Sequence, residues 1–177
     1  MSYISSIFYN LGQNGPTILA VITIYLLWNK KIMGFYYLLG YFLNSIVNLV
    51  LKGIFQQPRP SDNFTKFNTM MKNGKTNIFK DKGIPFNIFG MPSGHAQSCL
   101  FSTIFVFLTL RRTDILIFYL LLSIITITQR VQFSFHTIFQ TAVGAICGTI
   151  FAYLMFSFSN QKLKGKLREK PDDNAPF

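Results

Sequence analysis

Long apolar runs constrain the fold of this chain more than any other feature of its sequence. Half of the 177 residues are hydrophobic, and they gather in runs over roughly residues 16–29, 33–51, 96–110, 114–128 and 137–158. A helix needs ~20 apolar residues to cross the hydrocarbon core of a bilayer, at about 1.5 Å per residue. Runs of this kind therefore predict an all-α, polytopic membrane helical bundle with about five transmembrane helices.

The N-terminal stretch before the first run is apolar as well. Residues 1–13 carry no charged side chain, and Gly15-Pro16 follows them. This pattern predicts either an interfacial helix or an extension of the first span, with the Gly-Pro pair as a break or a first-turn signal. Because no basic region precedes the apolar run, we expect the first span to be a retained anchor rather than a cleaved signal peptide.

Positive charge lies between and after the apolar runs. The chain has 17 Lys and Arg against 6 Asp and Glu, a net charge of +11. Because these cations flank the spans, they indicate binding to anionic membrane lipid rather than to nucleic acid. With five spans, Lys30-Lys31, Arg111-Arg112 and the basic tail share one side of the membrane, which the positive-inside rule makes the cytoplasmic side.

The chain divides into one membrane domain and a tail. We expect residues 1–160 to form the membrane-embedded domain, because no linker to a second domain interrupts them. Residues 161–177 are polar and basic, and this composition predicts disorder. The long loop over residues 53–94 and the short loop over residues 129–135 fall on the side opposite the cytoplasmic cations.

Three polar segments stand on that opposite side, at the ends of the apolar runs. They are Lys52 to Pro60, Gly90 to Gln97 and Gln129 to Gln140. Polar and cationic side chains are costly near hydrocarbon, so these segments indicate a functional site. Spacing of four residues also predicts polar or small stripes facing the bundle interior, over Gly40, Asn44, Asn48 and Lys52, and over His136, Gln140, Gly144 and Gly148.

The segments together have the composition of a site for phosphoryl transfer. They supply three cations and two histidines, namely Lys52, Arg59, Arg130, His95 and His136. Pro92 is expected at a first helical position, so that the backbone N–H groups of Ser93, Gly94 and His95 point out of the positive end of the third span toward an anion. One histidine can attack phosphorus while the other protonates the leaving oxygen.

No metal or other cofactor is expected at this site. A two-metal carboxylate site needs several acidic ligands at one place, and the acidic residues of this chain are dispersed. They are Asp62 and Asp81 in the long loop, Asp114 on the cytoplasmic side, and Glu169, Asp172 and Asp173 in the tail.

The three segments resemble the signature motifs of the type 2 phosphatidic acid phosphatase family, within the superfamily of lipid phosphatases and vanadium haloperoxidases. That family's pattern is Lys, six residues, Arg-Pro; then Pro-Ser-Gly-His; then Ser-Arg, five residues, His, three residues, Asp. The spacing agrees from Lys52 to Arg59-Pro60, across Pro92 to His95, and from Arg130 to His136. Two positions depart from the pattern, with Gln129 in place of Ser and Gln140 in place of Asp.

The resemblance implies a role for each residue that matches. His136 would be the nucleophile that forms a phosphohistidine, and His95 the general acid for the leaving group and then the base for water. The phosphoryl oxygens would be bound by Lys52, Arg59, Ser93, Gly94 and Arg130. Gln140 lies four residues after His136, so we expect its amide oxygen to accept the Nδ1 proton and orient the ring without supplying charge.

Gln140 and several neighbouring residues are most similar to the dolichyldiphosphatase branch. The similar segments are Gln57-Pro-Arg-Pro60, Gly90-Met-Pro-Ser and His136-Thr137 followed by Gln140. This branch implies hydrolysis of a polyprenyl diphosphate to the monophosphate on the lumenal face of the endoplasmic reticulum. A phosphatase of broader range on phosphatidic acid and related lipids is the alternative, and a non-catalytic lipid-phosphate binder, favoured by Gln129 and Gln140, is a third hypothesis.

Overall fold

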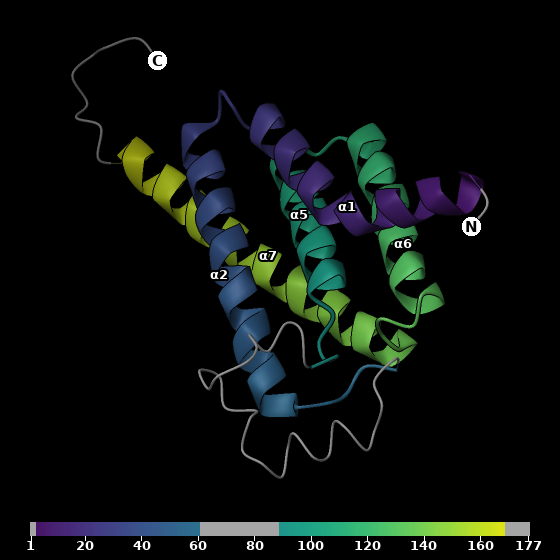
Figure 1. Ribbon diagram of the computed structural model, residues 1–177. Coiled ribbons are helices and arrows are strands. Elements are labelled where there is room, and N and C mark those ends of the chain that lie inside the picture. Colours follow the sequence, from purple (N-terminus) through teal and green to yellow (C-terminus); the bar gives the residue numbers. More distant parts are fainter. Residues whose placement is uncertain (1–2, 61–88, 169–177) are drawn as a thin grey trace.

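The structure is a computed structural model that describes residues 3–60 and 89–168. Over these residues it contains helices and no strand, which confirms the predicted all-α class (Figure 1). The helices are α1 (Tyr3–Leu26), α2 (Lys31–Phe55), α5 (Gly94–Leu110), α6 (Thr113–Gln132) and α7 (Ile138–Arg168). The predictions about Asp62 and Asp81, and about Glu169, Asp172 and Asp173, fall outside the described residues.

Three of the helices are long and apolar enough to cross a membrane. They are α2, α6 and the part of α7 from Ile138 to Gly165, while α5 is apolar but has only 17 residues. Helix α5 lies at the centre of the bundle and contacts each of the other four helices. The arrangement fits the predicted helical membrane bundle, in which the shortest helix is the one most enclosed by the others.

Helix α1 runs without interruption through Pro16, so Gly15-Pro16 is neither a break nor a helix start. Pro16 removes one backbone donor from the helix, and α1 changes direction along its length (Figure 1). Gly12 and Gly15 face α6, where a Cβ on either glycine would overlap the side chain of Gln129 or Thr126. The small residues therefore allow α1 to pack closely against α6.

Helix α7 extends further than the sequence indicates. It ends at Arg168, so the predicted disorder from residue 161 is wrong for residues 161–168, while residues 169–177 are not described. Its glycines face α5, because a Cβ on Gly144 would overlap the backbone of Ser93, and a Cβ on Gly148 would overlap that of Gln97. These two contacts place the start of α5 directly on α7.

The predicted polar stripe of α2 is buried and faces α5. Gly40, Asn44, Asn48 and Lys52 are all buried. The Nδ2 of Asn48 donates to Oε1 of Gln97 at 2.7 Å, and the Nε2 of Gln97 donates to Oδ1 of Asn44 at 2.8 Å. This hydrogen-bonded contact fixes the register of α2 against α5, and so places Lys52 at the level of the α5 N-terminus.

The two ends of the bundle differ in connectivity. The α1–α2 and α5–α6 connections, which contain Lys30 and Arg111, lie at the same end as the last turns of α7 (Figure 1). The end of α2, the start of α5 and the α6–α7 connection lie at the other end (Figure 1). The three polar segments of the sequence therefore converge, as their spacing along five helices predicts.

Candidate active site

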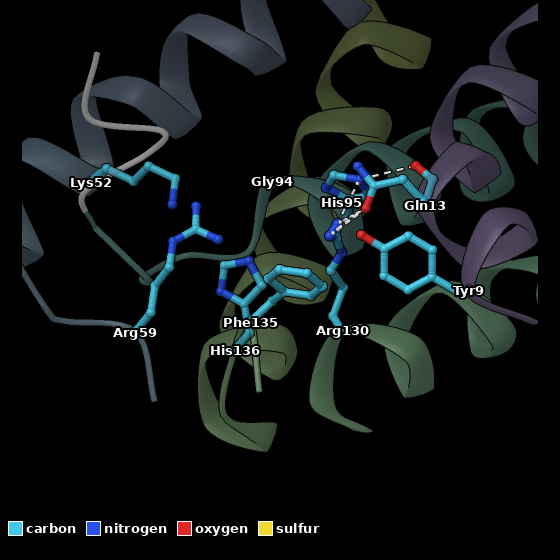
Figure 2. Close-up of a pocket in the computed structure, with 9 residues that line it drawn as sticks. All are labelled: Tyr9, Gln13, Lys52, Arg59, Gly94, His95, Arg130, Phe135 and His136. Carbon is cyan, nitrogen blue, oxygen red and sulfur yellow. Dashed lines mark hydrogen bonds between the residues drawn. The ribbon is translucent and has the colours of Figure 1, made fainter. Parts of the chain in front are cut away.

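A cavity of about 320 Å³ lies where the three polar segments meet. Six residues predicted to act on a phosphate line it, namely Lys52, Arg59, Gly94, His95, Arg130 and His136 (Figure 2). Three residues that were not predicted also line it, namely Tyr9 and Gln13 of α1 and Phe135. The predicted Ser93 and Gln140 do not line this cavity.

His136 is buried in the turn between α6 and α7, with 4% of its surface exposed. Its Nδ1 lies 2.7 Å from the backbone oxygen of Gly90. A carbonyl oxygen can only accept a hydrogen bond, so Nδ1 carries the proton and Nε2 keeps its lone pair. Because His136 lines the cavity, this tautomer gives the cavity a nucleophilic ring nitrogen.

The acceptor for the His136 proton is therefore Gly90, and the prediction that Gln140 accepts it is wrong. Oε1 of Gln140 accepts from the backbone N–H of Thr137 at 3.2 Å, and Oγ1 of Thr137 accepts from the N–H of Gln140 at 3.1 Å. These reciprocal bonds are a capping box that starts α7. His136 precedes the helix, so the four-residue helical spacing does not relate it to Gln140.

Gln140 instead joins the three polar segments to one another. Its Nε2 donates to the oxygen of Pro58 at 3.0 Å, and its backbone oxygen accepts from the N–H of Ser93 at 3.0 Å. Its side-chain amide also packs against Gly90, where an added Cβ would lie 2.7 Å from Oε1. Since Gly90 holds the His136 ring, Gln140 positions the nucleophile indirectly, through the backbone that receives its proton.

The electrostatic surroundings keep His136 neutral. Burial lowers the pKa of His136 to about 3, and the positive charges of Arg59 and Lys52 act in the same direction, while the bond to Gly90 opposes them. A neutral imidazole is the form that can attack phosphorus, so the site holds His136 in its reactive state near neutral pH. An anion bound among the cations would offset their effect on the ring.

The cations of the site come from three different elements. Lys52 lies in the last turn of α2, is 1% exposed, and donates from Nζ to the oxygen of Phe89 at 2.5 Å. Arg59 follows α2, and Arg130 lies in the last turn of α6. Within the described ranges the one ion pair, Arg112 with Asp114, lies at the opposite end of the bundle. The cavity is thus positively charged and suits a multiply charged anion such as phosphate.

Arg130 is held in place by α1 and by an aromatic ring. Both of its terminal nitrogens donate to Oε1 of Gln13, at 2.8 and 2.5 Å. Its guanidinium lies over the ring of Phe135, 4.5 Å from the centroid. Gln13 was not predicted, since its one signal in the sequence is an amide in an uncharged, mostly apolar stretch.

His95 has two partners that require opposite protonation states. Its Nε2 lies 3.2 Å from the backbone oxygen of Gln13 and 3.2 Å from a terminal nitrogen of Arg130 (Figure 2). A protonated Nε2 can donate to Gln13, and an unprotonated one can accept from Arg130. Both states of His95 therefore have a partner, as a group that gives and takes a proton in turn requires.

The start of α5 differs from the prediction in one respect. The helix begins at Gly94 with Ser93 as its N-cap, so Pro92, which follows a cis peptide bond, precedes the cap and is not a first helical residue. Ser93 is fully buried, its N–H is bound by Gln140, and its Oγ accepts from Ala96. The first-turn N–H groups that remain for an anion are those of Gly94 and His95.

Metal ligands are not gathered in the part of the chain that the structure describes. Residues 3–60 and 89–168 contain no group of three His, Cys, Asp or Glu side chains that could hold a metal ion. The metal-free mechanism stays a prediction, supported by cations and backbone donors that could stabilise a phosphoryl group by themselves.

Comparison with known proteins places these residues in context. Residues 33–164 match the PAP2 superfamily. The chain is also 31% identical over 134 residues to a curated protein, lipid phosphate phosphatase epsilon 1, chloroplastic, from Arabidopsis thaliana. That match covers 71% of this chain but only 40% of the relative, and no solved structure matches the chain. Helix α1, with Tyr9 and Gln13, precedes the residues that match the superfamily.

Proposed function

The chain belongs to the PAP2 superfamily, and from this premise we propose that it is a membrane lipid phosphatase that works through a phosphohistidine without a metal. One observation carries the proposal. His136 donates its Nδ1 proton to Gly90, which leaves Nε2 unprotonated in a cavity that also contains Lys52, Arg59 and Arg130. A neutral nucleophile beside three basic side chains is the arrangement that transfer of a phosphoryl group requires.

The first step forms the covalent intermediate. The phosphoryl oxygens bind to the three cations and to the backbone N–H of Gly94, and Nε2 of His136 attacks phosphorus. The bond from phosphorus to the lipid-side oxygen breaks as the new P–N bond forms. His95, protonated at Nε2, gives its proton to that leaving oxygen, so that no unstabilised alkoxide or anion is released.

The second step returns the enzyme to its starting state. His95 is now neutral and takes a proton from water, whose oxygen attacks the phosphorus of the phosphohistidine. The P–N bond breaks, phosphate leaves, and His136 is again neutral, with its Nδ1–H donating to the oxygen of Gly90. The Gln13 carbonyl is positioned to accept from His95 whenever Nε2 is protonated, at 3.2 Å.

The substrate is a lipid phosphate or diphosphate. The resemblance of Gln140 and its neighbours favours a polyprenyl, dolichyl-type diphosphate, and with it the endoplasmic reticulum and its lumenal face; these finer assignments stay predictions. The name of the Arabidopsis relative specifies a lipid phosphate, which supports the broader alternative of phosphatidic acid and related lipids.

Phosphate release in detergent tests the proposal. The purified protein is incubated with phosphatidic acid and with a polyprenyl diphosphate in the presence of a chelator, and the His136→Ala variant serves as the blank. We expect chelator-resistant release from at least one substrate, reduced about a thousandfold or more in the variant. A wild type that never exceeds the variant on any lipid phosphate would favour the non-catalytic binder instead.

A further inference from the structure

A second cavity of about 240 Å³ adjoins the active cavity at His95. Gln13, Gly94 and His95 line both cavities, whereas His136 and the three cations line only the first. Helices α1, α2 and α5 form the walls of this second cavity. His95 thus lies between the active cavity, which His136 and the three cations line, and the second cavity, which none of them lines.

The reaction geometry assigns a role to each space. In a displacement at phosphorus, the attacking atom and the leaving oxygen lie on opposite sides of the phosphoryl group. His136 lies on the side of Lys52 and Arg59, while His95 lies on the side of Gln13 (Figure 2). If His136 attacks and His95 protonates the leaving oxygen, the leaving group extends past His95 and into the second cavity.

The polar groups that line the second cavity include two hydrogen-bond acceptors, on Asn48 and Ser45, and no Lys or Arg side chain lines it. Asn48 is 2% exposed, and its Nδ2 donates to Gln97 and to the oxygen of Pro92, at 2.7 and 3.3 Å. Its Oδ1 lies beside Gly94 and has no hydrogen-bond partner among the described residues. The Oγ of Ser45 donates its proton to the backbone oxygen of Tyr41 at 3.1 Å. Toward a ligand, this Oγ can therefore act only as an acceptor.

We propose that the second cavity is the leaving-group subsite, and that it selects a phosphate monoester whose leaving alcohol carries a free hydroxyl close to the phosphate. The inference rests on the proposed function and specifies its substrate. A hydroxyl would donate to Oδ1 of Asn48 or Oγ of Ser45 and would satisfy a buried acceptor. The leaving group of a diphosphate is instead an anionic lipid monophosphate, whose oxygens would meet these acceptors, and once His95 has given up its proton no charged side chain lines this cavity to offset the repulsion.

Two substrates that differ only in one hydroxyl test whether the second cavity recognises this group. We expect kcat/KM for a monoacylglycerol phosphate to exceed that of its deoxy analogue, an acyl-propanediol phosphate, by about tenfold, because the analogue leaves the acceptor unpaired. A polyprenyl diphosphate should be hydrolysed more slowly than either monoester. All three measurements use the unaltered protein, so a folding defect cannot mimic the result.

A positive charge introduced into the second cavity tests the predicted repulsion of an anionic leaving group. Thr17 lines this cavity from α1 and takes no part in the chemistry of His136 or His95. Thr17→Lys should raise the ratio of diphosphate to monoester turnover severalfold above that of Thr17→Met, an uncharged change of similar length that controls for the volume filled.

Two outcomes separate the inference from the proposed function. Turnover of monoesters with no preference for the hydroxyl, or faster turnover of the diphosphate by the unaltered protein, would overturn the subsite while leaving the phosphatase intact. Absence of turnover on every lipid, with the His136→Ala protein indistinguishable from the unaltered one, would instead defeat the proposed function itself.

Discussion

The two halves of α5 contact their neighbours through different interactions. Hydrogen bonds dominate beside the active cavity, and packed aromatic rings dominate away from it. In the first half, Gln97 is held by directed hydrogen bonds to Asn44, Asn48 and the backbone of Ser93. The second half packs aromatic rings, with Phe101 and Phe105 against Tyr37 of α2 at centroid distances of 5.6 Å. Directed bonds define one geometry, whereas apolar packing tolerates substitutions that preserve volume. The site therefore adjoins the half of α5 in which an amide network, rather than stacked rings, makes the contact with α2.

The largest effect is expected where α7 meets the polar half. Gly144→Ala adds a methyl group that overlaps the backbone of Ser93, which cannot rotate away as a side chain can. Overpacking of this kind costs about 1–3 kcal/mol of stability and should displace the α5 N-terminus, lowering both the thermal midpoint in detergent and kcat. Gly165→Ala is the matched control, since an added Cβ there meets nothing within 4 Å. Equal behaviour of the two variants would refute this contact.

A smaller effect should follow from changing Gln140. Gln140→Glu keeps an acceptor for the Thr137 N–H, and so keeps the capping box, but it replaces the donor to Pro58 with a carboxylate. We expect thermal stability close to that of the unaltered protein and kcat reduced about tenfold, as for loss of an outer-shell positioning contact. Higher activity of the Glu variant would mean that a negative charge at this position reaches His136 after all.

The pH profile tests the charges around the nucleophile. His136 attacks phosphorus as a neutral imidazole, so activity is lost as the pH falls through its pKa, which burial, Arg59 and Lys52 lower to about 3. Arg59→Gln removes one of these charges, raises the pKa, and should move the acid limb of kcat/KM to higher pH. Arg112→Gln, a charge change at the opposite end, should leave the limb where it was. A limb that does not move with Arg59 would show that this charge does not act on His136.

The smallest effect is expected in the aromatic half. Tyr37→Phe removes the hydrogen bond between the Tyr37 hydroxyl and Oγ of Ser102, 2.8 Å apart, and keeps the ring stack on Phe101. Stability should fall by about 1 kcal/mol, while kcat and KM stay within about twofold of their original values. Calorimetry in detergent and a phosphate-release assay measure the two quantities. A catalytic defect as large as that of Gln140→Glu would contradict the claim that the aromatic half of α5 has little effect on catalysis.

Much of this site could be predicted because it depends on spacing along apolar helices. Five apolar runs fix which segments share an end of the bundle, and they bring Lys52, Arg59, His95, Arg130 and His136 to one cavity. The helical stripe of α2 was likewise predictable from residues four apart. In each case a single regular period determines the position of the side chain.

The errors have three separate causes. His136 precedes α7, so counting four residues to Gln140 gave the wrong partner, although Thr137-Ile-Phe-Gln140 is itself a recognisable capping box. Gln13 was missed because its function depends on how α1 packs against α6, and no motif encodes that contact. The helix to Arg168 was missed because a polar composition suggested disorder where, before Pro171, no proline stops the helix.

Trapping the covalent intermediate tests the central claim most directly. The protein would be mixed with a lipid substrate radiolabelled in its phosphate and quenched within the first turnover, and the labelled residue would be identified by mass spectrometry. The account predicts a phosphoryl group on His136 that is stable in base and labile in acid, and that is absent from His136→Ala. Full turnover without a labelled protein, or a label that persists in His136→Ala, would contradict it.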